Sequence, residues 1–274
     1  MKFTQASGER GAIHRGLAGE PIYLYQLLRK PLSKEAGVPL MFPWKYKWII
    51  GPLWFGVGVL LYLFSNHHFI FQAKLLKMSR IDQAIPFFVG TIWIYVSEAG
   101  FVLTAFLLNR CWVSLNIHLY SFMTLVVISC IFFSLYPTVY PRELYATHSL
   151  NPGLSERVLF GLWDLDQATN CLPSLHVSVA FQIALGFLED RKEWFPWMLI
   201  WSLLISISTL TIKQHYLMDV FAGLLLAAAL HYFFHHKLTY RVAELSYLGK
   251  GSFLISGSRQ KIVCDNSACE VWKK

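Results

Sequence analysis

Long runs of apolar residues, almost free of charge, alternate with short polar segments along most of the chain. About twenty apolar residues in a helix are enough to cross the roughly 30 Å hydrocarbon core of a bilayer. A helix satisfies all its backbone groups internally, as lipid requires. The pattern therefore predicts an all-α, polytopic membrane bundle of six transmembrane helices, at about residues 48–64, 84–108, 119–136, 175–188, 194–212 and 217–235.

The same pattern divides the chain into three parts. Residues 1–46 are expected to form a cytoplasmic N-terminal segment, in which the short apolar run 22–28 predicts an interfacial helix. Residues 47–236 are expected to form the six-helix transmembrane domain, which contains all the candidate catalytic residues. Residues 237–274 are expected to form a polar cytoplasmic tail, either a solvated appendage or a small regulatory or partner-binding element. A composition of 55% hydrophobic and 15% charged residues excludes an ordinary soluble protein.

The distribution of charge predicts the orientation in the membrane. Of the 24 lysines and arginines, 18 lie before the first span, after the last one, or in loops 109–118 and 189–193, and six lie in the other three loops. The positive-inside rule then places both termini in the cytoplasm and the other ends in the periplasm, exterior or lumen. The net charge of +8 suits contact with membrane lipids. A basic and aromatic nucleic-acid module is not found, so nucleic acid is not an expected partner.

Two polar strings at the outer ends of spans are the strongest candidates for chemistry. His215 and Asp219 are four residues apart, which on a helix places them on one face. A carboxylate beside a histidine fixes its tautomer and raises its basicity, although the pair could instead lock two helices together. Lys213, two residues upstream, could hold a phosphate or act as an interfacial lysine.

The other string is Pro173-Ser174-Leu175-His176, at the start of the fourth predicted span. Ser174 is suited to cap that helix, and the free N–H groups of a helix N-terminus bind phosphate well. His176 would lie in the first turn, placed to protonate a leaving oxygen. The alternative is an ordinary cap followed by an interfacial histidine.

Other polar residues have weaker signals. Arg142 follows the prolines that end the third span, where it could contact phosphate or anchor the interface. Glu98 falls inside an apolar span and is expected to be buried, with a substrate-tunnel role and a structural hydrogen bond as equal alternatives. Several histidines at the cytoplasmic ends are expected to be interfacial, namely His118, His231, His235 and His236. The five cysteines are scattered without metal-ligand spacing.

The Pro-Ser-x-His string followed by Ser208, His215 and Asp219 resembles the type 2 phosphatidic acid phosphatase superfamily, over about residues 136–226. Six-span members include lipid phosphate phosphatases, undecaprenyl-diphosphate phosphatases and inositol-phosphorylceramide synthases. Leu175 and Thr209 stand where many members have glycine and arginine. Those two forms are more similar to the inositol-phosphorylceramide synthase branch.

The first motif of the superfamily, Lys-x6-Arg-Pro, is not met. Leu135 occupies the lysine position if Arg142 is the arginine, and Glu143 follows it. The other motifs still imply that His215 attacks phosphorus and becomes a phosphohistidine, that Asp219 orients it, and that His176 protonates the leaving alcohol. The remaining implied roles are phosphate contacts from Arg142, Ser174 and Lys213. The resemblance implies no metal and no cofactor.

The function expected from this resemblance is that of an integral membrane phosphatase. It would hydrolyse a lipid phosphate monoester or diphosphate that reaches the site from within the bilayer. One alternative is a phospho-head-group transferase of the inositol-phosphorylceramide synthase type, which would use the same histidines. Another is a non-catalytic membrane protein or transporter that binds a phosphorylated lipid.

Overall fold

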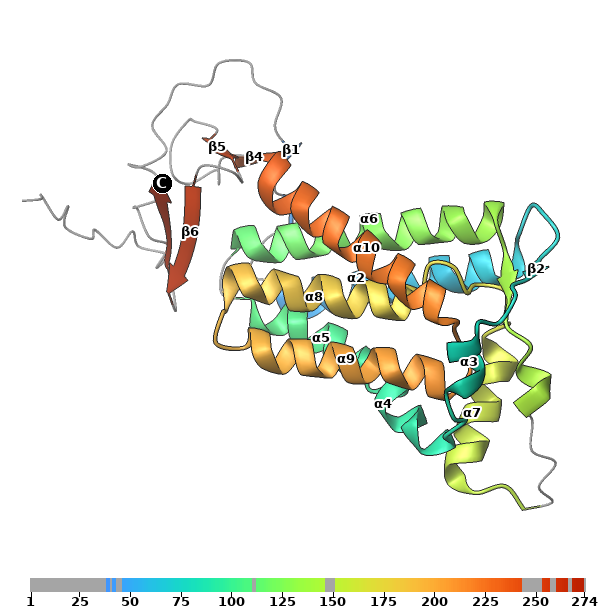
Figure 1. Ribbon diagram of the computed structural model, residues 1–274. Helices are drawn as coiled ribbons and strands as arrows, with labels where there is room; N and C mark the ends of the chain where they lie inside the picture. Colours follow the sequence, from blue (N-terminus) through green and yellow to red (C-terminus); the bar gives the residue numbers. More distant parts are fainter. Residues whose placement is uncertain are drawn as a thin grey trace, which may run out of the picture.

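The computed structural model describes residues 38–39, 41–42, 46–109, 112–145, 151–242, 253–256, 260–265 and 268–273. Its main body is a bundle of helices that run side by side (Figure 1). The helices are α2 (Lys47–His67), α3 (Arg80–Ala84), α4 (Ile92–Val96), α5 (Glu98–Leu108), α6 (Trp112–Leu135), α7 (Leu154–Leu165), α8 (Leu175–Asp190), α9 (Phe195–Thr211) and α10 (Leu217–Tyr232). Shorter turns are η2 (Val89–Thr91), η3 (Arg142–Tyr145) and η4 (Phe233–Lys237).

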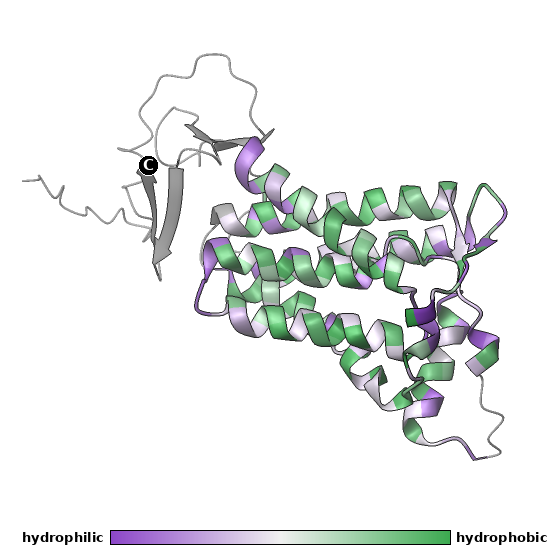
Figure 2. Cartoon of the chain, viewed as in Figure 1, coloured by the Kyte–Doolittle hydropathy of each residue, from purple (hydrophilic) through white to green (hydrophobic). Residues whose placement is uncertain are grey.

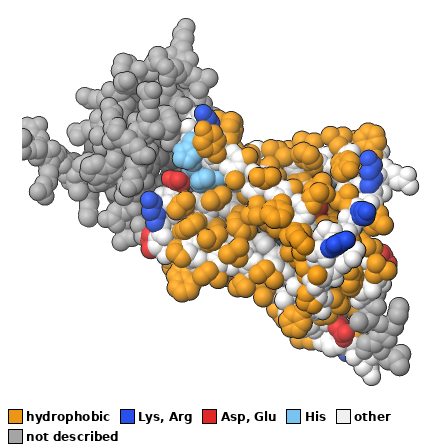
Figure 3. Space-filling model, viewed as in Figure 1, with side chains coloured by type: hydrophobic (Ala, Val, Ile, Leu, Met, Phe, Trp, Pro, Cys, Tyr) orange, Lys and Arg blue, Asp and Glu red, His pale blue; other side chains and the backbone are white. Residues whose placement is uncertain are grey.

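Apolar side chains cover the middle of the bundle, and polar ones gather at its ends (Figures 2 and 3). Four segments of the described chain combine the length and the apolar composition that crossing a bilayer requires. They are Lys47–His67, Val89–Leu108, Ser114–Leu135 and Leu217–Lys237. Only 17% of the apolar window of α2 is buried, as expected for a helix that faces lipid. A helical membrane protein is therefore supported.

The prediction of six spans is confirmed only in part. The remaining two predicted ranges do form helices, but α8 has 16 residues and α9 has 17, which is short for a span. The predicted range 84–108 also begins later than expected. Pro86 follows the end of α3, and helical structure resumes only at Val89. It is interrupted once more at Ser97, between α4 and α5. The Ser97 hydroxyl donates to the Ile94 carbonyl (2.6 Å), a side-chain bond that competes with the helix.

Helices α8 and α10 approach each other closely at the end of the bundle where both begin. A Cβ atom added at Gly223 of α10 would lie 2.7 Å from the carbonyl oxygen of Ser174, so this position has no room for a side chain. In addition, the Ser174 N–H donates to the Asp219 carbonyl (3.0 Å). These contacts hold the first turns of α8 and α10 beside each other.

The loops at this same end are joined by short pairings. Strand β2 (Lys74–Leu75) pairs in parallel with β3 (Thr138–Val139), and Thr138 also bridges to Asn170 in the loop before α8. The Tyr216 hydroxyl donates to the Val139 carbonyl (2.9 Å). The loops that precede α8 and α10 are therefore both held against the β2–β3 pair.

The predicted interfacial helix at residues 22–28 lies outside the described residues. Part of the C-terminal tail forms strands that sequence analysis did not anticipate. They are β4 (Thr239–Val242), β5 (Phe253–Ser256), β6 (Gln260–Asp265) and β7 (Ala268–Lys273), with β1 (Val38–Pro39) parallel to β4. Strands β4 and β5 pair antiparallel, as do β6 and β7.

Candidate active site

The two predicted histidines lie close together at the end of the bundle where α8 and α10 begin. His176 lies in the first turn of α8, and its ring centroid is 6.1 Å from that of His215. The prediction that His215 and Asp219 share one helix is wrong in detail. Asp219 is in the first turn of α10, but His215 precedes that helix, in the loop after α9. The loop bends back because the N–H groups of Gln214 and His215 both donate to the Thr209 carbonyl.

The tautomer of His215 is set by a backbone carbonyl. Its Nδ1 lies 3.0 Å from the Cys171 carbonyl oxygen, which can only accept, so Nδ1 carries the proton and donates. The Nε2 atom is then left with a free electron pair. His215 as a whole is only 6% exposed. An imidazole whose Nδ1 is fixed as a donor has Nε2 oriented for nucleophilic attack.

Asp219 contributes charge next to that ring. Its Oδ2 is 3.5 Å from the Nδ1 of His215, longer than a good hydrogen bond. The same oxygen accepts the Tyr216 N–H (2.8 Å), which caps the start of α10. Its Oδ1 is buried and has no hydrogen-bond partner among the described residues. Asp219 is therefore placed to stabilise positive charge that develops on His215.

His176 has an acidic partner of its own. Its Nε2 lies 3.6 Å from Oε2 of Glu98, and its Nδ1 lies 3.3 Å from the Tyr95 hydroxyl. Glu98 is only 7% exposed, as predicted for a carboxyl inside an apolar segment. The rings of Tyr95 and Tyr62 flank His176, at centroid distances of 4.3 and 6.5 Å. These groups fix the position of the His176 ring beside His215.

Arg142 is buried and held by groups near His215. Its guanidinium donates to the Asp166 carbonyl (2.5 Å) and to the side-chain oxygen of Gln214, the residue before His215. Its Nη2 also lies 3.6 Å from the Asp166 carboxylate, which accepts the Tyr62 hydroxyl (2.6 Å). Burial raises the pKa of Asp166 above its usual value, although Arg142 opposes the effect. These contacts fix a cation beside the histidine pair, where a phosphate dianion would be favoured.

The Lys213 side chain is bonded to backbone carbonyls beside α3. Its backbone has a φ of 60°, the left-handed region that a lysine rarely adopts, at the end of α9. Its ammonium donates to the Ile85 carbonyl (2.6 Å) and the Asp82 carbonyl (3.4 Å) beside α3, and lies 4.9 Å from the Tyr145 ring centroid. Burial lowers the pKa of Lys213, and the nearby Asp82 counteracts this. In this structure the ammonium therefore joins α3 to the loop that carries His215.

Ser174 forms the helix cap that the sequence indicated. Its hydroxyl accepts the Val177 N–H (3.4 Å), and the residue is fully buried. Sequence reasoning missed four other contributors, because their roles depend on loops brought together by folding. They are Tyr62, Tyr95, the Cys171 carbonyl and Gln214, and only Gln214, next to His215, had a signal in the sequence.

One group at the site has the residue types of a metal-binding set. Ligand atoms of Cys171, His215 and Asp219 lie within 4.8 Å of one another. Burial, followed by the nearby Asp219, raises the pKa of the Cys171 thiol well above its usual value. That thiol also lies 3.2 Å from the Ala168 carbonyl, to which it donates. A thiol held protonated in this way is a poor metal ligand.

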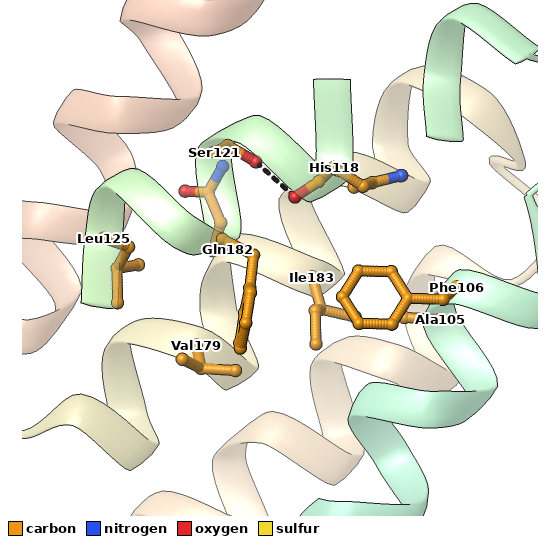
Figure 4. A pocket seen from close by; sticks show the side chains of 9 residues that line it. Ala105, Phe106, His118, Ser121, Leu125, Val179, Gln182 and Ile183 are labelled. Atoms are coloured by element: carbon orange, nitrogen blue, oxygen red, sulfur yellow. Dashed lines mark hydrogen bonds between the residues drawn. The ribbon is translucent and has the colours of Figure 1, made fainter. Parts of the chain in front are cut away.

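A small cavity lies elsewhere in the bundle, between α5, α6 and α8 (Figure 4). Its volume is about 10 Å³, which is room for about one water molecule. The Gln182 side chain lines it, and both polar atoms of that amide lack hydrogen-bond partners in the described part of the chain. The cavity is suited to a bound water and is far too small for a lipid.

One comparison with known proteins matches the part of the chain that contains the site. A family model described as the PAP2 superfamily matches residues 91–233, slightly more than half of the chain. The matched range includes both histidines and their acidic partners. A search of curated proteins finds no match to the chain.

Proposed function

The chain belongs to the PAP2 superfamily, and from this membership and the paired histidines we propose that it is an integral membrane phosphatase. The superfamily covers phosphatases and related phosphotransferases. The proposed substrate is a lipid phosphate monoester or diphosphate whose head group reaches the site from within the bilayer. The observation that carries the proposal is the bond from Nδ1 of His215 to the Cys171 carbonyl, which leaves Nε2 free to attack.

The proposed reaction has two steps. In the first, the electron pair on Nε2 of His215 attacks phosphorus, and the bond from phosphorus to the leaving oxygen breaks. His176 gives that oxygen a proton, and Asp219 stabilises the positive charge on the phosphorylated ring. In the second step, His176 takes a proton from water as the water oxygen attacks phosphorus. The P–N bond then breaks, which releases phosphate and restores His215.

Two further side chains support these steps. We assign Glu98 as a positioning residue that orients the His176 ring, since its Oε2 lies 3.6 Å from Nε2. Arg142 would contact the oxygens of the phosphate. Such chemistry depends mainly on positioning and on charge stabilisation. The proposed mechanism uses no metal, so activity should persist in the presence of a chelator.

The proposed membrane arrangement has six spans. Helices α8 and α9 would extend about 24 and 26 Å, close to the roughly 30 Å hydrocarbon core, and they lie alongside the four longer segments (Figure 1). Both termini would then be cytoplasmic, as the distribution of lysine and arginine indicates. The histidine pair would face the periplasm, exterior or lumen.

Phosphate release by the purified, detergent-solubilised protein tests the proposal. Suitable substrates are phosphatidate, phosphatidylglycerophosphate, a prenyl diphosphate and a sphingoid phosphate. We expect one class to be hydrolysed without an added acceptor and His215→Ala to abolish the activity. His68→Ala is the control, because His68 is exposed beyond the end of α2. No release from any substrate, or full activity of His215→Ala, would contradict the proposal, and release that requires a lipid alcohol would indicate transfer in place of hydrolysis.

A further inference from the structure

The end of the bundle opposite the histidine pair carries a second cluster of histidines. His231, near the end of α10, is followed by His235 and His236 in η4. Glu189 lies near the end of α8. On the face shown in Figure 3, histidine side chains gather beside acidic and basic ones at this end. His176 and Glu189 are thirteen residues apart on α8, so this cluster is about 20 Å from the candidate active site.

The ligand atoms of the cluster lie close enough together to reach one metal ion. Ligand atoms of Glu189, His231 and His236 all lie within 4.8 Å of one another, and Nε2 of His231 is 3.9 Å from Oε1 of Glu189. The Zn–N and Zn–O bond lengths place ligands of a tetrahedral zinc ion roughly 3.4 Å apart. Glu189 and His236 are exposed and can close this difference by side-chain rotation.

The backbone explains why His231 and His236 meet. In an α-helix, residues five apart differ in direction by roughly 140°, so these two side chains would diverge. Residues Phe233–Lys237 instead form a π-helical turn, in which the Leu238 N–H donates to the Phe233 carbonyl (3.1 Å). A π turn brings residues five apart to nearly the same face, and such turns are frequent at functional sites.

Two imidazoles at this end are not fully satisfied by hydrogen bonds. Nδ1 of His231 and Nε2 of His235 are buried without hydrogen-bond partners in the part of the chain that the structure describes. The two rings lie against each other, with centroids 4.5 Å apart. His231 is only 8% exposed. Buried imidazoles without hydrogen-bond partners are costly, so this end of the bundle is suited to taking up a polar ligand.

We propose that Glu189, His231 and His236 bind a divalent transition-metal ion of the kind that imidazole and carboxylate ligands prefer, such as Zn²⁺. A water molecule would complete the coordination. The ion would join the ends of α8 and α10, the same two helices that begin at the candidate active site. This assignment does not depend on the proposed phosphatase activity.

Equilibrium binding of Zn²⁺ to the full chain in detergent, after removal of metals with a chelator, tests the site. We expect one equivalent to bind, and Glu189→Gln and His236→Gln each to weaken binding about tenfold or more. Both residues are exposed, so these variants should fold. The matched controls are Glu193→Gln, an exposed carboxylate at the same end, and His68→Gln at the other end.

A further variant separates this cluster from the active-site group. Cys171→Ser should bind Zn²⁺ like the wild type, and bound Co²⁺ should show the spectrum of nitrogen and oxygen ligands without a thiolate band. The proposal is overturned if the wild type takes up no Zn²⁺ or if Glu189→Gln and His236→Gln bind it as tightly as the wild type. It is also overturned if Cys171→Ser removes binding.

Discussion

Replacing Asp219 with asparagine isolates the charge of that side chain from its structural role. An asparagine oxygen can still accept the Tyr216 N–H, so the cap of α10 should persist. The tautomer of His215 should also persist, because the Cys171 carbonyl fixes it. The variant therefore loses mainly the attraction between the carboxylate and the positive charge that forms on His215 during phosphoryl transfer.

The size of the loss follows from the distance. At 3.5 Å and an effective dielectric constant of about 20, two unit charges attract by about 5 kcal/mol. Each 1.36 kcal/mol is tenfold in rate, so loss of the whole attraction would lower the rate by at most about 3,000-fold. The amide dipole replaces part of the attraction, and we expect kcat of Asp219→Asn to fall about 10² to 10³-fold, with a smaller change in KM.

The assay is steady-state phosphate release, with the thermal unfolding midpoint measured in the same detergent. Asp164→Asn is the matched control, because Asp164 is an exposed carboxylate near the outer loops and should keep full activity. The reasoning is refuted if Asp219→Asn retains activity within about threefold of the wild type, since a charge at this distance cannot then stabilise the reacting ring. It is also refuted if the variant is inactive because it fails to fold.

Three other predictions concern the neighbouring side chains. His176→Ala should slow a substrate with an alkoxide leaving group far more than one with an activated leaving group, and equal slowing of both would exclude a role in protonation. Glu98→Gln should lower kcat about tenfold and shift the pH–rate profile, whereas the control Glu143→Gln should change neither. An unchanged pH–rate profile for Glu98→Gln would contradict the assignment that Glu98 acts through His176. Lys213→Met should lower the free energy of unfolding by about 2 kcal/mol through loss of the bonds to Ile85 and Asp82, and a large rise in KM without loss of stability would instead indicate phosphate contact.

The sequence predicted the ranges of the long apolar helices but not α3 and α7, and it singled out two histidines whose rings lie 6.1 Å apart in the structure. Apolar runs long enough to form these helices can be read directly from the sequence, and the spacing between His215 and Asp219 already indicated that the two residues form a pair. The length of each helix was harder to predict. The apolar pattern continues across Pro86 and Ser97, but the structure interrupts the helix near both positions: proline lacks an N–H for the helix, and the Ser97 hydroxyl bonds the Ile94 carbonyl.

The contacts that tune the site could not be predicted. The carbonyl that fixes His215 belongs to Cys171, and a backbone atom has no signature in the sequence. The direction of Lys213 depends on a left-handed backbone conformation, with φ of 60°, that nothing about a lysine suggests. The π turn that brings His236 beside His231 likewise becomes visible only in three dimensions.

The most direct test of the account is to trap the phosphorylated protein. The enzyme is mixed with lipid substrate labelled in the transferred phosphate, quenched in alkali within one turnover, and digested. The account predicts an acid-labile label on Nε2 of His215, absent from His215→Ala and accumulated when the second step is slowed. Turnover without any label on that ring, or a label on another residue, would contradict it.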